Sequence, residues 1–322
     1  MAPRDSVVSL ARRVLGSTRL MVDPLCIGCA ALGNMPETFG YAVGEEQALA
    51  TIRAIFDGPI TFVDTAASYG SGESERRIGI VLRERGGLPP GFVLSTKADR
   101  DLQTGDFSGG QVQRSIERSL NLLGLERLPL VYLHDPEHTT FERAMSPGGP
   151  VEALQRCQDE GLIDHIGVAG GPIDVLTRYI ETGAFEVVIS HNRYTLLNVA
   201  ADPLWTIAQQ RGVAAINAAP YGSGILVKGP RAYPRYGYRE ATGTIQARAQ
   251  HLEDICVRYN VPLAAAALQF SLRDPRITST IIGVSDSTQL AATSALAQYP
   301  ISERVWDELK VVKPATDDIE TP

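Results

Sequence analysis

The sequence predicts an α/β protein of the (β/α)8 TIM barrel class. Short apolar runs alternate eight times with amphipathic segments along the chain. Each amphipathic segment is long enough to cross back over a sheet, so neighbouring strands should run parallel. The length of 322 residues and the 44% hydrophobic content suit one barrel domain spanning residues 1–322.

The eight predicted strands are apolar runs at 24–29, 60–64, 92–96, 129–134, 163–168, 185–190, 213–217 and 279–283. The predicted helices lie at 45–57, 72–86, 109–124, about 140–161, 172–183, 202–211, 244–272 in two pieces, and 286–299. Glycines support this phasing because they favour the left-handed conformation that ends a helix; they are Gly124, Gly161, Gly183 and Gly212. Pro262 separates the two pieces of the 244–272 segment.

Two segments depart from a regular barrel. The N-terminal extension of 23 residues contains the stretch STRLMVD, which we expect to be extended and to close the bottom of the barrel. Residues 219–243 form a loop rich in Gly, Pro, Tyr and Arg that is too long for a routine barrel connection. Because this loop follows the seventh strand, we expect it to emerge on the active rim as a lid or clamp over a bound cofactor.

A doubly wound sheet is the main competing fold. It is disfavoured because no G-x-G-x-x-G motif opens a helix after the first strand. The most similar string, Gly70-Ser71-Gly72, is followed three positions on by Glu75 instead of glycine.

The composition argues against nucleic acids and membranes as binding partners. The net charge of -7 and the absence of a Lys/Arg-rich run argue against nucleic-acid binding. No apolar run reaches 18 residues, and the charged start of the chain does not fit a signal peptide, so we expect a cytoplasmic protein without a membrane partner.

The CIGC string, Cys26 to Cys29, lies inside an apolar strand and indicates buried thiols instead of a redox pair or a zinc site.

Four polar residues lie at or just past the ends of predicted strands. Asp64 ends the second strand, Lys97 the third and His134 the fourth, and Tyr69 follows Asp64 by five residues. In a barrel these ends form one rim, where active sites lie. A phenol with a pKa of about 10 is a weak acid at neutral pH, but a neighbouring ammonium lowers that pKa. We therefore predict that Tyr69 is a proton shuttle, with Lys97 held charged by Asp64.

A metal site is the alternative interpretation of this rim. His134 opens the string HDPEH, whose Asp135, Glu137 and His138 could serve as ligands in a metal-dependent barrel hydrolase. Such hydrolases usually draw an H-x-H or similar set from other strand ends, and this chain has five His in all. We therefore expect no metal.

Several strings resemble the aldo-keto reductase family. They are FVDTAASYGSGESERRIG at 62–79, STK at 95–97 and LVYLHDPE at 130–137, and the match extends from LCIGCAALGN at 25–34 to GVSDSTQLAAT at 283–293. The strings HNRYTLLN at 191–198 and NAAPYGSG at 217–224 resemble the branch with L-fucose, D-threo-aldose and galactose 1-dehydrogenases and pyridoxal 4-dehydrogenase.

The resemblance implies a (β/α)8 barrel that binds NAD or NADP in an extended pose. By position, Tyr69 would exchange a proton with the substrate oxygen, Lys97 and Asp64 would tune Tyr69, and His134 would orient that oxygen. The implied cofactor contacts are Gly28, Cys29, Ala30, Asp64, Ala169, Gly170, His191, Ala219, Pro220, Tyr221, Gly222, Gly224, Lys228, Gly283, Val284, Ser285, Gln289 and Thr293. The expected substrate contacts are Met35, Phe39 and Asn192.

The nicotinamide end departs from the family pattern. Many members hold the carboxamide with Ser-Asn and Gln and stack a Tyr under the ring, whereas the aligned residues here are Ala169, Gly170, His191 and Ala218. Candidates to compensate are Asn192, Tyr194 and Tyr221.

The segment aligned with the adenosine phosphate favours NAD. Members that prefer NADP carry Lys or Arg in this segment to pair with the 2′-phosphate. This chain has no Lys or Arg between Arg276 and Arg304, and it has Asp286 inside the segment. NADP is the alternative, because the helix near Ser287 could present N–H groups to a phosphate.

The resemblance leads us to expect an NAD(P)-dependent dehydrogenase of a small polar substrate, either a sugar or a pyridine aldehyde or alcohol. We expect oxidation of an aldose at C1 to a lactone, with Tyr69 as the base. The alternatives are NADPH-dependent carbonyl reduction, a pyridoxal 4-dehydrogenase, and a sensor that binds the nucleotide without turnover.

Overall fold

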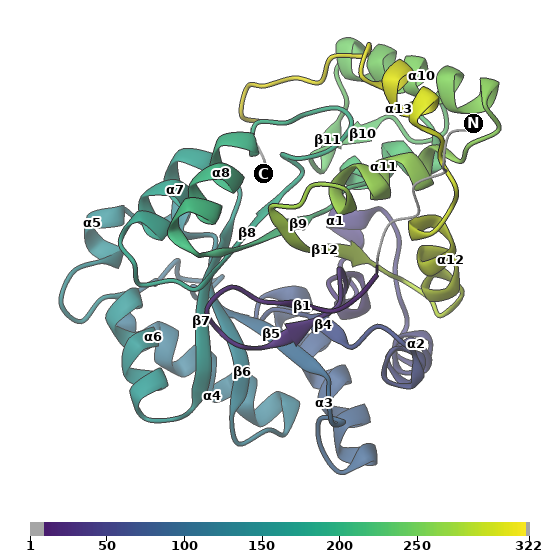
Figure 1. Ribbon diagram of the computed structural model, residues 1–322. Coiled ribbons are helices and arrows are strands. Elements are labelled where there is room, and N and C mark those ends of the chain that lie inside the picture. The colour runs from purple at the N-terminus through teal and green to yellow at the C-terminus, as the bar shows by residue number, and fades with distance from the viewer. Residues whose placement is uncertain (1–9, 320–322) are drawn as a thin grey trace.

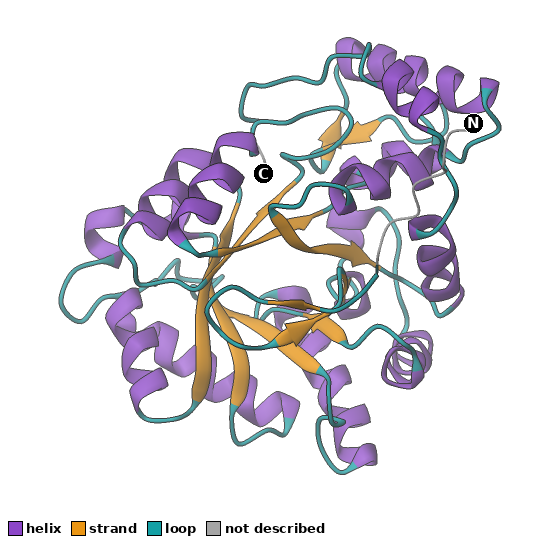
Figure 2. Cartoon of the chain, in the orientation of Figure 1, coloured by secondary structure: helices purple, strands orange, loops and turns teal. Residues whose placement is uncertain are grey.

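Eight parallel strands close into a barrel in the computed structural model, which describes residues 10–319 (Figure 1, Figure 2). The strand order around the barrel is β12-β3-β4-β5-β6-β7-β8-β9. The strands are β3 (Leu25–Gly28), β4 (Phe62–Asp64), β5 (Val93–Ala98), β6 (Leu128–His134), β7 (Ile163–Gly170), β8 (Val187–His191), β9 (Ala214–Ala218) and β12 (Ile277–Gly283). The predicted fold class and all eight predicted strands are confirmed.

Helices surround the barrel (Figure 2). They are α2 (Glu45–Asp57), α3 (Glu73–Arg85), α4 (Gly109–Leu123), α5 (Phe141–Ala144), α6 (Pro150–Asp159), α7 (Ile173–Glu181), α8 (Asp202–Arg211), α10 (Gly243–Arg258), α11 (Leu263–Leu272), α12 (Thr288–Ala297) and α13 (Glu303–Leu309). The helix predicted over 140–161 is two helices, α5 and α6. Gly148 has a positive φ of 74°, and Pro150 starts α6, so the chain turns between them.

A short hairpin closes the bottom of the barrel, as predicted. It pairs β1 (Arg13–Val14) with β2 (Met21–Val22) in antiparallel fashion. Leu15 and Val22 are fully buried in the same cluster as the barrel-interior residues Phe62 and Leu130. The hairpin therefore caps the barrel interior; residues 1–9 of the predicted extension lie outside the described residues.

The long loop after β9 has structure of its own. It contains the helices η4 (Gly222–Gly224) and α9 (Ile225–Lys228) and a hairpin of β10 (Arg235–Tyr236) with β11 (Arg239–Glu240). Figure 1 shows this hairpin beyond the ends of the neighbouring barrel strands. The final segment crosses back to the same side, where the Val199 N–H donates to the Ala315 carbonyl at 2.7 Å.

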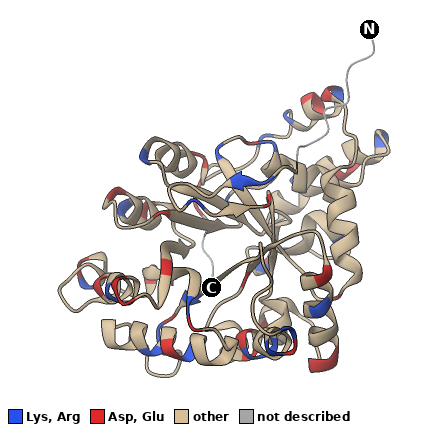
Figure 3. Cartoon of the chain, turned by 60° about the horizontal axis from the view of Figure 1, so that its bottom comes forward, with Lys and Arg blue, Asp and Glu red and all other residues tan. Residues whose placement is uncertain are grey.

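Acidic and basic positions are interspersed along the outer helices (Figure 3). Among the described residues, no single helix is long and apolar enough to cross a membrane. Helices α10 and α11 pass that test only as a pair, and they are bent by 104° where they meet.

Candidate active site

A cavity of about 1220 Å³ lies at the carboxyl ends of the barrel strands; we call it the rim cavity. Its wall includes the last or next-to-last residue of every barrel strand, namely Gly28, Asp64, Lys97, His134, Gly170, His191, Ala218 and Gly283. Tyr69 also lines it. The four residues predicted to act together therefore share one cavity.

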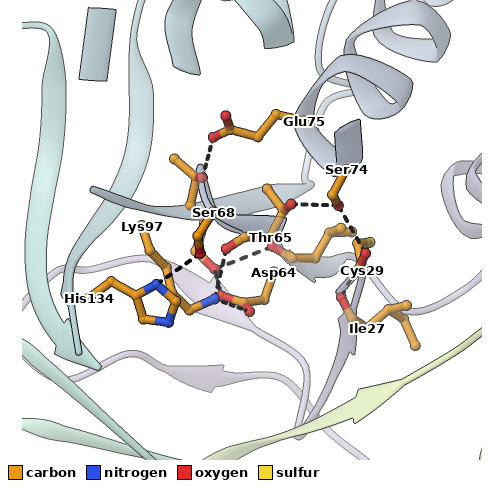
Figure 4. A network of polar contacts seen from close by, with 12 residues as sticks. Ile27, Cys29, Asp64, Thr65, Ser68, Ser74, Glu75, Lys97 and His134 are labelled. Atoms are coloured by element: carbon orange, nitrogen blue, oxygen red, sulfur yellow. Dashed lines mark hydrogen bonds and ion pairs between the residues drawn. The ribbon is translucent and has the colours of Figure 1, made fainter. Parts of the chain in front are cut away.

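Lys97 and Asp64 form a buried ion pair on the wall of the rim cavity. The Lys97 ammonium donates to Asp64 Oδ2 at 2.5 Å and to the Thr65 carbonyl at 2.7 Å, and both side chains of the pair are 3% exposed. Figure 4 shows the ammonium facing the carboxylate. The Ser95 hydroxyl donates to the other oxygen of Asp64 at 2.9 Å, so each charge is also hydrogen-bonded.

A tight turn presents Tyr69 to this pair. Tyr69 begins the short helix η2 (Tyr69–Gly72), in which Gly70 has a positive φ of 60°. A Cβ on Gly70 would lie 1.9 Å from the Gly33 carbonyl oxygen, so only glycine fits there. The turn places the Tyr69 ring centroid 4.7 Å from Lys97 Nζ and 5.9 Å from the His134 ring.

The acidity of Tyr69 differs from the sequence-based expectation. Burial raises the pKa of Tyr69, the charge of Lys97 and a hydrogen bond with it lower that pKa, and the net result lies above the ordinary value. The prediction that Lys97 lowers the pKa of Tyr69 is confirmed for the contribution of Lys97 itself. The prediction that the net pKa would lie below the ordinary value is wrong, because burial raises the pKa by more than the Lys97 charge lowers it. Lys97 itself stays protonated: burial lowers its pKa, but Asp64 and Tyr69 raise it to a net value above the ordinary one.

His134 is held by an aspartate that sequence reasoning missed. Asp99 Oδ1 lies 2.6 Å from His134 Nδ1, and Asp99 Oδ2 accepts the N–H of Ser68 at 2.9 Å. One buried carboxylate therefore fixes both the His134 ring and the residue before Tyr69. Because Nδ1 is engaged with Asp99, Nε2 is the ring nitrogen left to act on a ligand. Burial lowers the pKa of His134, but Asp135 and Asp99 raise it to a net value above the ordinary one.

We expect Asp99→Asn to impair turnover by about 10- to 100-fold, because the amide no longer fixes the His134 ring. The loss of the Asp99 charge also lowers the pKa of His134, so the inflection of the kcat/KM profile assigned to His134 moves to lower pH. The measurement is kcat/KM against pH. The control is Asp159→Asn on the exposed end of α6, which should behave as wild type. An unshifted profile in Asp99→Asn would contradict the role of Asp99.

Most of the other predicted site residues line the rim cavity. They are Ala30, Ala169, Ala219, Tyr221, Gly224, Lys228, Gln289 and Thr293 for the cofactor, and Met35 and Phe39 for the substrate. Those that do not line it are Cys29, Pro220, Gly222, Val284, Ser285 and Asn192. Cys29 and Val284 belong to the hydrophobic core, and Gly222 packs against the Tyr236 ring.

Asn192 and Tyr194, two of the candidates to compensate at the nicotinamide end, do not line the rim cavity themselves. Asn192 has a positive φ of 60° and is fully buried, and its amide contacts His191 Nδ1 at 3.2 Å and the Ser223 hydroxyl at 3.3 Å. The Tyr194 hydroxyl donates to Asp274 at 2.5 Å. His191 and Ser223 both line the rim cavity, so Asn192 lies directly behind its wall and its ligand contact stays a prediction. The Tyr194 contact also stays a prediction, and Tyr221, the third candidate, is on the wall.

The long loop covers one side of the rim cavity, as predicted. Lys228 Nζ lies 4.3 Å from the Tyr233 ring centroid and 5.6 Å from that of Tyr41. The Tyr238 ring packs edge-on against Phe39 at 6.4 Å. The loop thus meets the segment after β3 across the cavity.

No group of three or more His, Cys, Asp or Glu side chains in the part of the chain from 10 to 319 is arranged to hold a metal ion. His134, the central residue of the metal hypothesis, is instead paired with Asp99.

The model of the Aldo/keto reductase family matches residues 24–313. The chain belongs to this family. Aldo-keto reductases are oxidoreductases, and the predicted enzyme class is confirmed. The paired Lys97 and Asp64, with Tyr69 and His134 beside them, lie inside the matched region.

Three relatives of this aldo-keto reductase match over most of its length. It is 30% identical to D-threo-aldose 1-dehydrogenase of a Pseudomonas species, covering 90% of this chain and 94% of that one. It is 31% identical to pyridoxal 4-dehydrogenase of Microbacterium luteolum, covering 93% and 96%, and 29% identical to L-galactose dehydrogenase of Arabidopsis thaliana, covering 93% of each.

Solved structures agree with the fold of this aldo-keto reductase. The holo form of an aldo-keto reductase from Bacillus halodurans superposes with a TM-score of 0.78 at 21% identity, covering 97% of this chain and 99% of that one.

Proposed function

We propose that this aldo-keto reductase oxidises the C1 hydroxyl of an aldose to a lactone, with NAD as the hydride acceptor. The observation that carries the proposal is the placement of Tyr69, Lys97, Asp64 and His134 together on one cavity wall. The similarity to a D-threo-aldose and an L-galactose dehydrogenase over nine-tenths of the chain supports an aldose as substrate.

In this proposal Tyr69 takes the proton of the C1 hydroxyl. Burial makes the phenolate costly, and the ammonium of Lys97 offsets part of that cost. Asp64 keeps the ammonium charged and fixes its position. His134 Nε2 holds the reacting oxygen, with Asp99 fixing the ring from the other side.

The rim cavity suits a nicotinamide dinucleotide, which would accept the hydride from C1. Its volume of about 1220 Å³ exceeds that of common small-ligand pockets, roughly 300–1000 Å³, and its wall runs from the strand ends to Gln289 and Thr293 of α12. Tyr221 lines this wall with its ring, and its hydroxyl is buried without a hydrogen-bond partner among the described residues. A Cβ on Gly28 would lie 2.8 Å from the Ile281 side chain, so glycine keeps this part of the wall clear.

The choice of NAD rests on the charge at the start of α12, a helix whose Gln289 and Thr293 line the rim cavity. The chain has no Lys or Arg from 277 to 303. Asp286 accepts hydrogen bonds from Thr288 and Gln289, which lower its pKa, so its negative charge sits at the start of α12. A 2′-phosphate at this position would be repelled by the Asp286 carboxylate and would have no Lys or Arg of this segment to pair with. Lys228, on the long loop, is our candidate for the pyrophosphate.

We expect turnover of at least one aldose in a panel that includes L-fucose, L-galactose and D-arabinose, and we expect NADH to bind more tightly than NADPH by at least about tenfold. Lactone formation with NAD is followed by NADH absorbance, and affinity is measured by fluorescence titration. Tighter NADPH binding would overturn the NAD assignment. Absence of aldose oxidation with either cofactor would overturn the proposed reaction.

Oxidation of pyridoxal is the second candidate. It is favoured by the 31% identity to a pyridoxal 4-dehydrogenase and by Phe39, Tyr41 and Tyr238, whose rings line the rim cavity and could face a pyridine. Including pyridoxal in the same panel decides between the two.

A further inference from the structure

Asp135 carries a carboxylate into the rim cavity directly beside His134. Its backbone is left-handed, with a φ of 44°, and its N–H donates to the Ala169 carbonyl at 2.7 Å. This fixed backbone aims the side chain at the rim cavity, which it lines with 29% of its surface exposed.

The Asp135 carboxylate lacks a hydrogen-bond donor within the described residues. Asp135 Oδ1 lies 3.6 Å from His134 Nε2, and this distance is longer than a hydrogen bond. Burial raises the pKa of Asp135, but the charges of His134, His191 and His138 lower it to a net value below the ordinary one, so the carboxylate is ionised. An ionised carboxylate on a cavity wall can accept strong hydrogen bonds from a ligand.

We propose that His134 Nε2 and Asp135 together bind a vicinal diol: the reacting hydroxyl on His134 and the hydroxyl of the neighbouring carbon on Asp135. This inference rests on the proposed function, and it names the substrate class as sugars with a free hydroxyl next to the reacting carbon. The oxygens of a gauche vicinal diol lie about 2.8 Å apart, similar to one hydrogen bond. Two such oxygens can therefore contact two protein atoms that are 3.6 Å apart.

This arrangement separates sugars from pyridoxal. In an aldose the C1 and C2 oxygens are on adjacent carbons. In pyridoxal the ring hydroxyl and the aldehyde oxygen are on carbons separated by a third carbon, so that pair matches the 3.6 Å site less well. Asp135 therefore favours the aldose reaction over the pyridoxal reaction.

Glu137 provides a matched control in the same cavity. Its Oε1 accepts the Gly171 N–H at 3.1 Å, and none of its hydrogen bonds involves His134. Glu137→Gln changes the charge of the rim cavity without changing the proposed diol site, so it should change activity toward two matched sugars by the same factor.

The test compares kcat/KM for the preferred aldose and its 2-deoxy analogue. We expect the wild type to prefer the aldose by about 10- to 150-fold, the range for hydrogen bonds to charged groups. In Asp135→Ala the preference should fall to within about threefold, whereas Glu137→Gln should keep the wild-type ratio. A wild type without this preference, or an Asp135→Ala variant that retains it, overturns the inference.

Two further measurements keep the test decisive. If Asp135→Ala does not fold, judged by circular dichroism, Asp135→Asn replaces it and should lower the ratio at least about threefold; an unchanged ratio overturns the inference.

If the wild type oxidises no aldose, the proposed function fails, and the diol site is tested separately by reduction of lactaldehyde against propanal. A preference for lactaldehyde that Asp135→Ala removes supports the site, and equal rates overturn it.

Discussion

Replacing Tyr69 by Phe should reduce kcat for sugar oxidation by about 10²- to 10⁴-fold, the range for a lost general acid or base. The phenyl ring fills the same space beside Lys97 and His134, so packing in the rim cavity is kept. The hydroxyl that would take the substrate proton is the one group removed. The measurement is steady-state kcat with the preferred aldose and saturating NAD.

Cofactor affinity separates this chemical effect from a general loss of structure. Tyr69→Phe should bind NADH within about twofold of wild type in a fluorescence titration, because the ring stays in place. Tyr299→Phe is the matched control, because that hydroxyl donates to the Asn260 carbonyl in an exposed hydrogen bond and Tyr299 does not line the rim cavity. Wild-type turnover in Tyr69→Phe would remove Tyr69 from the mechanism.

Replacing Lys97 by Met should lower the free energy of unfolding by about 3–5 kcal/mol, the usual cost of breaking a buried ion pair on one side. Lys97 and Asp64 are each 3% exposed and lie 2.5 Å apart, so the variant leaves the Asp64 carboxylate buried without its counter-charge. Activity should also fall strongly, because the contribution that lowers the pKa of Tyr69 is lost. Urea unfolding and kcat measure the two effects.

A double variant distinguishes stability from chemistry at this pair. In Lys97→Met with Asp64→Asn the uncompensated charge is gone, so part of the unfolding free energy should return. Activity should stay low, because no ammonium faces Tyr69. A double variant as unstable as Lys97→Met would contradict the claim that the unpaired carboxylate causes the loss, and recovered activity would contradict the role of Lys97.

The barrel and its rim could be predicted because the sequence marks them locally. Apolar runs mark the strands, and polar residues at the strand ends mark the rim, so Asp64, Lys97 and His134 could be placed on the rim from the sequence alone. The helices α2 and α8 begin and end at the predicted residues, and Gly212, with a φ of 70°, ends α8 as expected.

Other features depend on contacts that the sequence does not mark. The hairpin of β10 and β11 has two residues in each strand, too few for a pattern. Asn192 lies behind the wall of the rim cavity, in a backbone conformation with positive φ that its residue type permits but does not require. Asp99 did leave a signal, since it follows Lys97 by two residues, the spacing of one strand face.

In the proposed mechanism Tyr69 exchanges a proton with the substrate beside the charged ammonium of Lys97. The most direct test of this exchange is the single-turnover rate of sugar oxidation against pH, in wild type and Tyr69→Phe. Because the pKa of Tyr69 lies above its ordinary value, the wild-type rate should rise with pH through neutrality as the phenolate fraction grows, and the Tyr69→Phe rate should be low and lack that rise. A Tyr69→Phe profile with the wild-type slope and rate would contradict this role of Tyr69.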